Sequence, residues 1–359
     1  MATTTSTPRS PFVRPPRRGE LATVAALREA LHAEARRADE GGGGGEALAA
    51  DARERLVAST SAALEEERIV VRVAEDPDGA TATDGAPALV GIALGRDTVW
   101  PPVWRTRRVG EIPEVYVEPG RRGRGLGRAL LLAVSDELAR RGAEVLRSRV
   151  VARDEAVRAR FAAAGFEPLL RTFARPVVVD DDDPAFPVRA AVPADVPSLV
   201  LLHAAMLEEN GRLEPRLAPH PELRANAAAE LPRRLADAEH VVLVAEERPG
   251  LVVGFAAGRL ERGDGVRGPE RVGTVTDCFV VPARRRRGLA RALATRLARA
   301  LAARHAEELR LHVVARNADA LAFWSSLGYR PVEELLEKPA PRRGPPDAAA
   351  RTATSSRRP

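Results

Sequence analysis

Two stretches of the chain carry the same sequence at a constant separation of 163 residues. Aligned without a gap, positions 89–166 and 252–329 are identical at 32 of 78 positions, and Gly125 then stands opposite Gly288. By chance, about a tenth of the positions would be identical in a chain so rich in Ala and Arg. The sequence therefore predicts a duplicated domain.

The chain has room for both copies, because 359 residues allow two domains of about 150–200 residues, each with its own core. We predict an N-terminal domain over 13–176 and a C-terminal domain over 188–339. Four consecutive Asp and two Pro make 177–187 the predicted linker. Residues 1–12 and the basic segment 340–359 are too poor in apolar residues to order themselves, and we predict disordered tails.

Composition narrows the functional classes. The single cysteine, Cys278, excludes an internal disulfide, and we predict that it packs as a small apolar residue in the core. No Cys or His cluster has metal-ligand spacing, so we expect no bound metal. No run of about 18 apolar residues occurs, so a membrane is not an expected partner. The basic stretches lack interleaved aromatic residues, which argues against nucleic acid. We expect a cytoplasmic protein of undetermined oligomeric state.

Periodicity predicts a mixed α/β fold in each half. The expected order is strand, two helices, three strands, helix, strand, helix, strand. In the second half the predicted elements are a strand at 188–191, helices at 193–209 and 221–236, strands at 240–245, 251–259 and 271–281, a helix ending at 304, a strand at 309–314 and a helix at 317–327. The first half adds surface insertions at Gly41–Gly45 and Pro77–Pro87.

A basic turn containing glycine joins a strand to a helix in both copies. The first turn of a helix has unpaired N–H groups and a positive dipole end, and glycine lets an anion approach the main chain closely. An ordinary turn with exposed arginines is the alternative. The residues predicted to bind an anionic cofactor are Arg122, Gly123, Arg124, Gly125, Leu126 and Gly127 in the first copy and Arg285, Arg286, Arg287, Gly288, Leu289 and Ala290 in the second.

The context of these turns resembles one family. A Val-x-Pro strand end precedes each turn, and Asp154 or Asn317 stands 29 residues after the turn glycine. Arg285-x-x-Gly288-x-Ala290 and its first-half counterpart resemble the pyrophosphate-binding motif of the GNAT superfamily of acetyl-CoA-dependent N-acyltransferases. The segment 317–329 resembles the following motif, a helix against which the pantetheine arm and sulfur lie. Asn317 and Trp324 of that segment are therefore candidate cofactor-binding residues.

The resemblance implies two tandem GNAT-like domains. We predict from the ungapped repeat that each is a mixed sheet splayed around the strand that ends at Pro119 or Pro282, and that the two halves are related by a rough two-fold or screw operation. It implies direct transfer of an acetyl group from acetyl-CoA to an amine. Pantetheine would pair with the edge of the strand at Val280 or Val117, and a backbone N–H there would stabilise the oxyanion. Asp277 is the candidate base, with a structural role as the alternative.

Departures from the family pattern separate the two halves. Where the family commonly has Phe-Tyr, with the phenol placed to protonate the leaving thiolate, the second half has Phe323-Trp324 and the first Arg160-Phe161. Trp324 is then a core or cofactor-packing aromatic. The first half also has Asp154 and Val157 where the second has Asn317 and Ala320. We therefore predict catalysis by the second half, with the first as a CoA-binding or structural partner in which Glu114 aligns with Asp277 and Glu111 lies nearby.

Several functions remain open from the sequence. The acceptor could be a small-molecule amine, a protein N-terminus or lysine, or an amine in thiol biosynthesis, because mycothiol synthases are also tandem GNAT proteins. The missing tyrosine favours a second class, a non-catalytic protein that binds or senses acyl-CoA. A third class, nucleic-acid binding through Arg284–Arg287, would show itself by salt-dependent retention on DNA.

Overall fold

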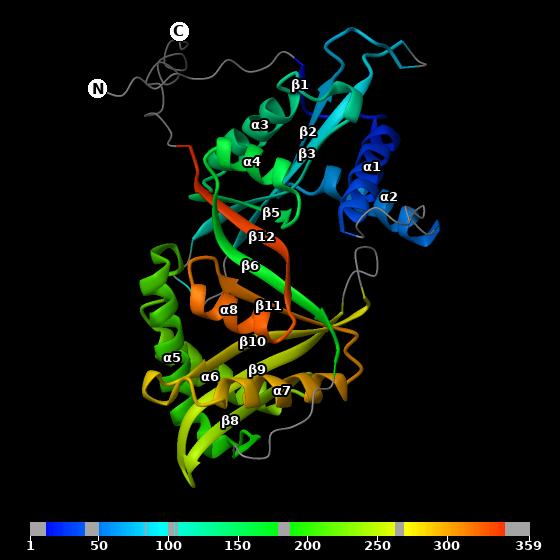
Figure 1. Ribbon diagram of the computed structural model, residues 1–359. Helices are drawn as coiled ribbons and strands as arrows, with labels where there is room; N and C mark the ends of the chain where they lie inside the picture. The colour runs from blue at the N-terminus through cyan, green and yellow to red at the C-terminus, as the bar shows by residue number, and fades with distance from the viewer. Residues whose placement is uncertain are drawn as a thin grey trace, which may run out of the picture.

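The computed structural model describes residues 12–39, 50–82, 85–99, 104, 107–178, 187–262 and 269–341 (Figure 1). Most of the predicted linker and tails, and the Gly41–Gly45 insertion, lie outside these residues. The first half consists of β1 Val13–Arg14, α1 Leu21–Asp39, α2 Ala50–Glu65, β2 Ile69–Glu75, β3 Leu89–Val99, β4 Arg108–Val117, the 3-10 turn η1 Pro119–Arg121, α3 Leu126–Arg140, β5 Val145–Val151, α4 Glu155–Ala163 and β6 Glu167–Pro176.

The second half repeats this order, as the sequence predicts. Its elements are β7 Val188–Ala190, η2 Pro193–Asp195, α5 Val196–Leu213, η3 Pro215–Leu217, α6 Leu223–Ala236, β8 His240–Arg248, β9 Leu251–Arg262, β10 Arg271–Val280, η4 Pro282–Arg284, α7 Leu289–Ala302, β11 Glu308–Val314, α8 Ala318–Ser326 and β12 Arg330–Pro339. Predicted and observed bounds agree to within a few residues, with the largest difference at the end of α5.

The two halves share one twelve-stranded sheet, which differs from the expectation of a separate sheet in each half. The strand order is β1-β2-β3-β4-β5-β12-β6-β11-β10-β9-β8-β7. Each half therefore gives its last strand to the other: β12 pairs with β5, and β6 pairs with β11. Figure 1 shows β6 and β12 side by side where the halves meet. The order of equivalent strands is the same from either end of the sheet, which fits the two-fold alternative of the predicted relation.

The pseudo-two-fold axis passes between Arg171 of β6 and Glu334 of β12. These residues are 163 positions apart and stand opposite each other in the β6–β12 register. In an assembly of identical copies the two positions would carry the same residue, and like charges would repel. Here Arg171 Nε lies 3.1 Å from Glu334 Oε1. The duplicated chain thus places opposite charges on its own symmetry axis.

Helices cover both faces of each half of the sheet. In the first half, α3 packs on one apolar cluster with residues such as Ile112 and Val117, while α1 and α2 cover the opposite face around Ile92 and Tyr116. The second half repeats this with α7 on one face and α5 and α6 on the other. Alternate residues of the central strands β4 and β10 therefore face different helix layers. None of the described helices is both long and apolar enough to cross a membrane.

Candidate active site

A wedge-shaped gap opens beside the central strand of each half. Strand β4 pairs with β5 only over 109–111 with 145–147, and β10 pairs with β11 only over 272–275 with 308–311. The central strand then continues without that neighbour. At the same point along the strand, its pairing with the preceding strand is irregular. Thr276 is the extra residue of β10, and Pro113 occupies the equivalent position of β4. The parallel strands therefore separate next to a bulge.

The gap exposes backbone donors of the central strand. The N–H of Val281 donates to Val253 O on β9, and the N–H of Glu118 donates to Val90 O on β3. Because successive N–H groups of a strand point to opposite edges, those of Val280 and Val117 point into the gap. This edge is where the sequence predicts that pantetheine pairs.

Each central strand leads through its basic turn into a helix without a side-chain cap. The N-cap residues Gly125 and Gly288 have φ of 82° and 85°, the left-handed region that glycine adopts without strain. The first intrahelical bonds run from Ala129 N to Gly125 O and from Ala292 N to Gly288 O. The amide groups that precede these donors in each helix have no intrahelical acceptor, so each turn offers N–H donors to an anion.

The first arginine of each turn has a structural partner, which the sequence did not reveal. Arg122 Nε donates to Val117 O at 2.9 Å and Arg285 Nε donates to Val280 O at 2.9 Å. Their guanidinium groups also pair with Glu34 of α1 and Glu209 of α5, at 2.6 and 2.7 Å. These contacts tie each turn to the end of the central strand and to a helix. Their prediction as cofactor ligands remains a prediction.

The other arginines of the two turns differ in their partners. Arg124 pairs with Asp78, whereas Arg286 and Arg287 make no ion pair with a described residue. Arg286 also has a φ of 62° where the first half has Gly123. A non-glycine residue in this region carries strain of about 1–2 kcal/mol. The second turn therefore keeps two arginines available to an anion.

The predicted sulfur-side helix begins at an N-cap in both halves. Asn317 Oδ1 accepts a hydrogen bond from Ala320 N at 3.0 Å, and Asp154 Oδ1 accepts one from Val157 N at 2.9 Å. Each side chain stabilises its helix start in the way that Asn and Asp prefer, a signal the sequence carried. Trp324 is buried and packs edge-on against Phe323 and Tyr329, with ring centroids 5.0 and 5.2 Å away. A core role accounts for Trp324 without a ligand.

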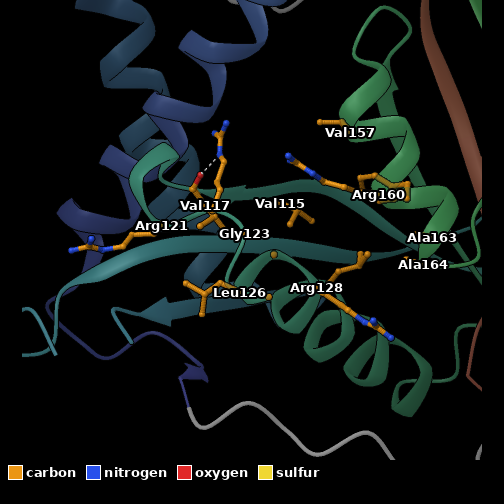
Figure 2. Close-up of a pocket in the computed structure, with 15 residues that line it drawn as sticks. Val115, Val117, Arg121, Gly123, Leu126, Arg128, Val157, Arg160, Ala163 and Ala164 are labelled. Carbon is orange, nitrogen blue, oxygen red and sulfur yellow. Dashed lines mark hydrogen bonds between the residues drawn. The ribbon is translucent and has the colours of Figure 1, made fainter. Parts of the chain in front are cut away.

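A cavity of about 380 Å³ occupies the first-half gap. Figure 2 shows it between the turn, strand β4 and helix α4. Its lining residues are Val115, Val117, Arg121, Arg122, Gly123, Gly125, Leu126, Gly127, Arg128, Leu131, Val157, Arg160, Phe161, Ala163 and Ala164. Five of the six predicted anion-binding residues of this turn, together with Val117, thus surround one cavity; Arg124 is not part of its lining.

The predicted base, Asp277, lies on the α5–α6 face of β10 inside a cluster of donors. Its Oδ1 is 3.4 Å from His203 Nε2 of α5, and its Oδ2 is 3.3 Å from Arg234 Nη1 of α6. Thr276 Oγ1 donates to Oδ2 at 2.7 Å. Burial alone would raise the pKa of Asp277, but His203, Arg234 and Thr276 together lower it. Asp277 is only 6% exposed.

The equivalent carboxylate of the first half is held more firmly. Arg28 of α1 donates from Nε and Nη2 to Glu114 Oε2 and Oε1 at 2.7 and 2.8 Å, and His32 Nε2 lies 3.6 Å from Oε1. Burial raises the pKa of Glu114, and the hydrogen bonds from His32 and Arg28 outweigh it and lower the value to about 2. Glu111 instead pairs with the exposed Arg96.

Sequence reasoning missed the cations that hold these carboxylates. Counted from the matching first strands at Val13 and Val188, Arg28 and His203 occupy equivalent positions of α1 and α5, so a comparison of these helices could have found them. His203 differs from Arg28 in having a buried Nδ1 without a hydrogen-bond partner among the described residues. The two halves therefore place different chemistry at one position, a bidentate guanidinium and an imidazole.

Substituting Gly288 should weaken CoA binding far more than removing a nearby charge. Gly288→Val forces a β-branched residue into the left-handed region, at a cost of about 1–3 kcal/mol, and obstructs the amide groups. Arg287→Ala removes one exposed charge, worth about 1 kcal/mol or less. Calorimetric titration with CoA measures both, with Gly125→Val as the matched first-half variant. Equal losses for Gly288→Val and Arg287→Ala would mean that side-chain charge holds the phosphates.

The comparisons with known proteins agree with this fold. A crystal structure of a GCN5-related N-acetyltransferase from Sphaerobacter thermophilus matches with a TM-score of 0.55 and 19% identity, covering 93% of this chain and 96% of that chain. A glucosamine N-acetyltransferase region of a fungal multi-domain β-N-acetylglucosaminidase matches with a TM-score of 0.51 and 16% identity over 92% of this chain and 38% of that one. No curated protein sequence matches.

A tandem GNAT protein from the clavulanic acid biosynthesis pathway is also similar, with a TM-score of 0.48 and 17% identity over 92% of this chain and 99% of that chain. The model of the acetyltransferase (GNAT) family matches residues 46–166 and 204–329, which is more than half of the chain. Each match contains one basic turn and one gap. The chain therefore belongs to the GNAT acetyltransferase family and carries two GNAT domains in tandem.

Proposed function

We propose that this protein transfers an acyl group from acetyl-CoA to an amine. The observation that carries the proposal is the gap beside each central strand, where free backbone N–H groups adjoin an uncapped helix start. Phosphates of CoA suit the helix start, and the amide groups of pantetheine suit the strand edge. A thioester carbonyl at the same edge would meet a backbone donor for its oxyanion.

The two faces of the sheet suit the two substrates. Val280 belongs to the apolar cluster under α7, whereas Asp277 faces α5 and α6 through His203 and Arg234. The CoA thioester would approach from the α7 face and the amine from the α5–α6 face, and they would meet in the gap between β10 and β11. Burial and the neighbouring Asp277 charge raise the pKa of Cys278 to about 12, which favours direct transfer over a covalent thiol intermediate.

We place transfer in the second half. His203 leaves one ring nitrogen free beside Asp277, so this pair could take up a proton directly or through water. In the first half, the position equivalent to His203 holds Arg28, a permanent cation that cannot accept a proton, and the imidazole near Glu114 belongs to His32, four residues further along α1. Pro113 also lacks a backbone N–H where the second half has Thr276, so the first-half bulge has one donor fewer. Asp277 would then act mainly by orienting His203.

Binding without transfer is the second candidate function. Both central-strand carboxylates are buried and ion-paired, which is also the arrangement of structural residues. A protein that holds acyl-CoA in two gaps would be a sensor or carrier. The amine, if one is used, could be a small molecule, a protein amine or an intermediate of thiol biosynthesis.

Release of free CoA thiol from acetyl-CoA across a panel of amines separates these functions. Transfer predicts thiol release that depends on one class of amine, with the acetylated amine as the second product. Tight binding of acetyl-CoA without amine-dependent release would support the sensor. Failure to bind any CoA compound would remove both proposals.

A further inference from the structure

We propose that Arg160 gives the first-half gap a cationic group for an oxyanion of a bound CoA thioester, at the place where the second-half gap has an aromatic ring. This inference rests on the proposed function only in taking CoA compounds as ligands of the gap. The bound group would be an oxyanion that reaches the middle of the cavity. A CoA thioester can supply one from its diphosphate or from a carboxylate at the end of its acyl chain.

Arg160 is a charged residue among apolar residues on the α4 side of the cavity. It projects from α4, and the residues beside it in the lining are Val157, Phe161 and Ala163 of α4 and the C-cap residue Ala164. Figure 2 shows its side chain reaching from α4 back toward the turn, above Val115 of β4. The Arg160 guanidinium makes no ion pair or hydrogen bond with a described residue, in contrast to those of Arg121 and Arg122 on the opposite wall. Arg160 is exposed, and its guanidinium lies above Val115 of β4 without a protein partner among the described residues.

The duplication provides an internal comparison for this position. The second half has Phe323 at the equivalent place of α8, where the ring packs against Trp324 and the apolar core. The rest of the helix start is conserved in geometry, with Asp154 and Asn317 capping in the same way. An aromatic ring suits an uncharged acyl or pantetheine arm, whereas a guanidinium offers a planar set of donors to carboxylate or phosphate. The two gaps should therefore differ in the charge that they accept.

Arg160 is the cation on the α4 side of the cavity, and the other arginines of the lining have partners or point elsewhere. Arg122 is occupied by Val117 O and Glu34, and Arg121 is occupied by Asp76. Arg128 also lines the cavity, but in Figure 2 its side chain points away from Arg160. An anion in the middle of the cavity would thus have the main-chain amides of the turn on one side and Arg160 on the other.

The test compares Arg160→Phe, which installs the second-half residue, with Arg160→Lys and with the control Arg128→Ala. Calorimetric titrations of the full chain would use CoA, acetyl-CoA and succinyl-CoA. A charge-assisted hydrogen bond predicts a loss of about tenfold in affinity for Arg160→Phe. Arg160→Lys should recover part of it, and Arg128→Ala should cost less. The loss should shrink at high salt, because screening weakens partly exposed charges.

The three ligands identify the source of the anion. Equal losses for CoA, acetyl-CoA and succinyl-CoA assign Arg160 to the diphosphate. A loss confined to succinyl-CoA assigns it to an acyl carboxylate. Unchanged affinities for all three ligands overturn the inference while leaving the proposed function intact. Absence of binding by the unaltered chain would instead contradict the proposed function.

Discussion

Glu114→Gln should lower the free energy of unfolding by about 3–5 kcal/mol, because it leaves the buried Arg28 guanidinium without its counter-charge. Arg28 is 8% exposed and Glu114 4%, so water cannot replace the lost partner. Chemical denaturation monitored by circular dichroism measures the change. The matched control is Glu111→Gln on the same strand, whose partner Arg96 is exposed and whose loss should cost about 1 kcal/mol or less.

The pH dependence of stability should identify the same group. Burial raises the pKa of Glu114, but the hydrogen bonds from His32 and Arg28 lower it by more, so the folded value is about 2 against 4.5 in the unfolded chain. A lowered folded pKa stabilises the protein above the unfolded value, and this contribution disappears as the pH falls from about 4.5 toward 2. Glu114→Gln should lack that part of the acid transition.

A double variant separates charge from packing. Arg28→Met with Glu114→Leu replaces the ion pair by apolar groups and should recover much of the lost stability, because an apolar replacement of a buried pair is often neutral or better. If Glu114→Gln were as stable as the unaltered chain, the Arg28–Glu114 pair would not be a structural element of this fold.

Much of the fold could be predicted from the sequence because local patterns decide it. The β-branched runs of 240–245 and 271–281 and the glycines of the two turns locate elements without reference to distant residues. The spacing of 163 residues then transfers each assignment to the other half. The same reasoning identified the turn residues that surround the first-half cavity.

The exchange of β6 and β12 could not be predicted, because the two strands hold equivalent places in their halves and their alternative partners, β5 and β11, have similar sequences. Glu167–Pro176 meets equivalent neighbours whether it pairs with β5 or with β11, so only the three-dimensional path of the chain decides. The pairs Arg285–Glu209 and Asp277–His203 likewise join residues about 75 positions apart on different elements. Such contacts follow from packing and leave no local signal.

Asp277→Asn should lower the rate of acetyl transfer by about 10²-fold while leaving acetyl-CoA affinity nearly unchanged. A primary amine is mostly protonated at neutral pH, so its proton must be removed before attack. Asparagine keeps the shape of Asp277 but loses the charge that holds His203 Nε2 at 3.4 Å and Arg234 Nη1 at 3.3 Å. Steady-state kinetics on the amine identified by thiol release, corrected for the folded fraction, measures the effect.

Three comparisons decide what Asp277 does in that step. Because His203 and Arg234 hold its pKa below the ordinary value, Asp277 acting alone as the base would keep the rate constant down to acid pH. A loss of rate in His203→Asn equal to that in Asp277→Asn would instead assign proton uptake to the imidazole and orientation to Asp277. Glu114→Gln should leave the turnover of folded protein unchanged; if it abolishes transfer while Asp277→Asn is silent, the first half is the catalyst, and if both are silent, the proton leaves to solvent.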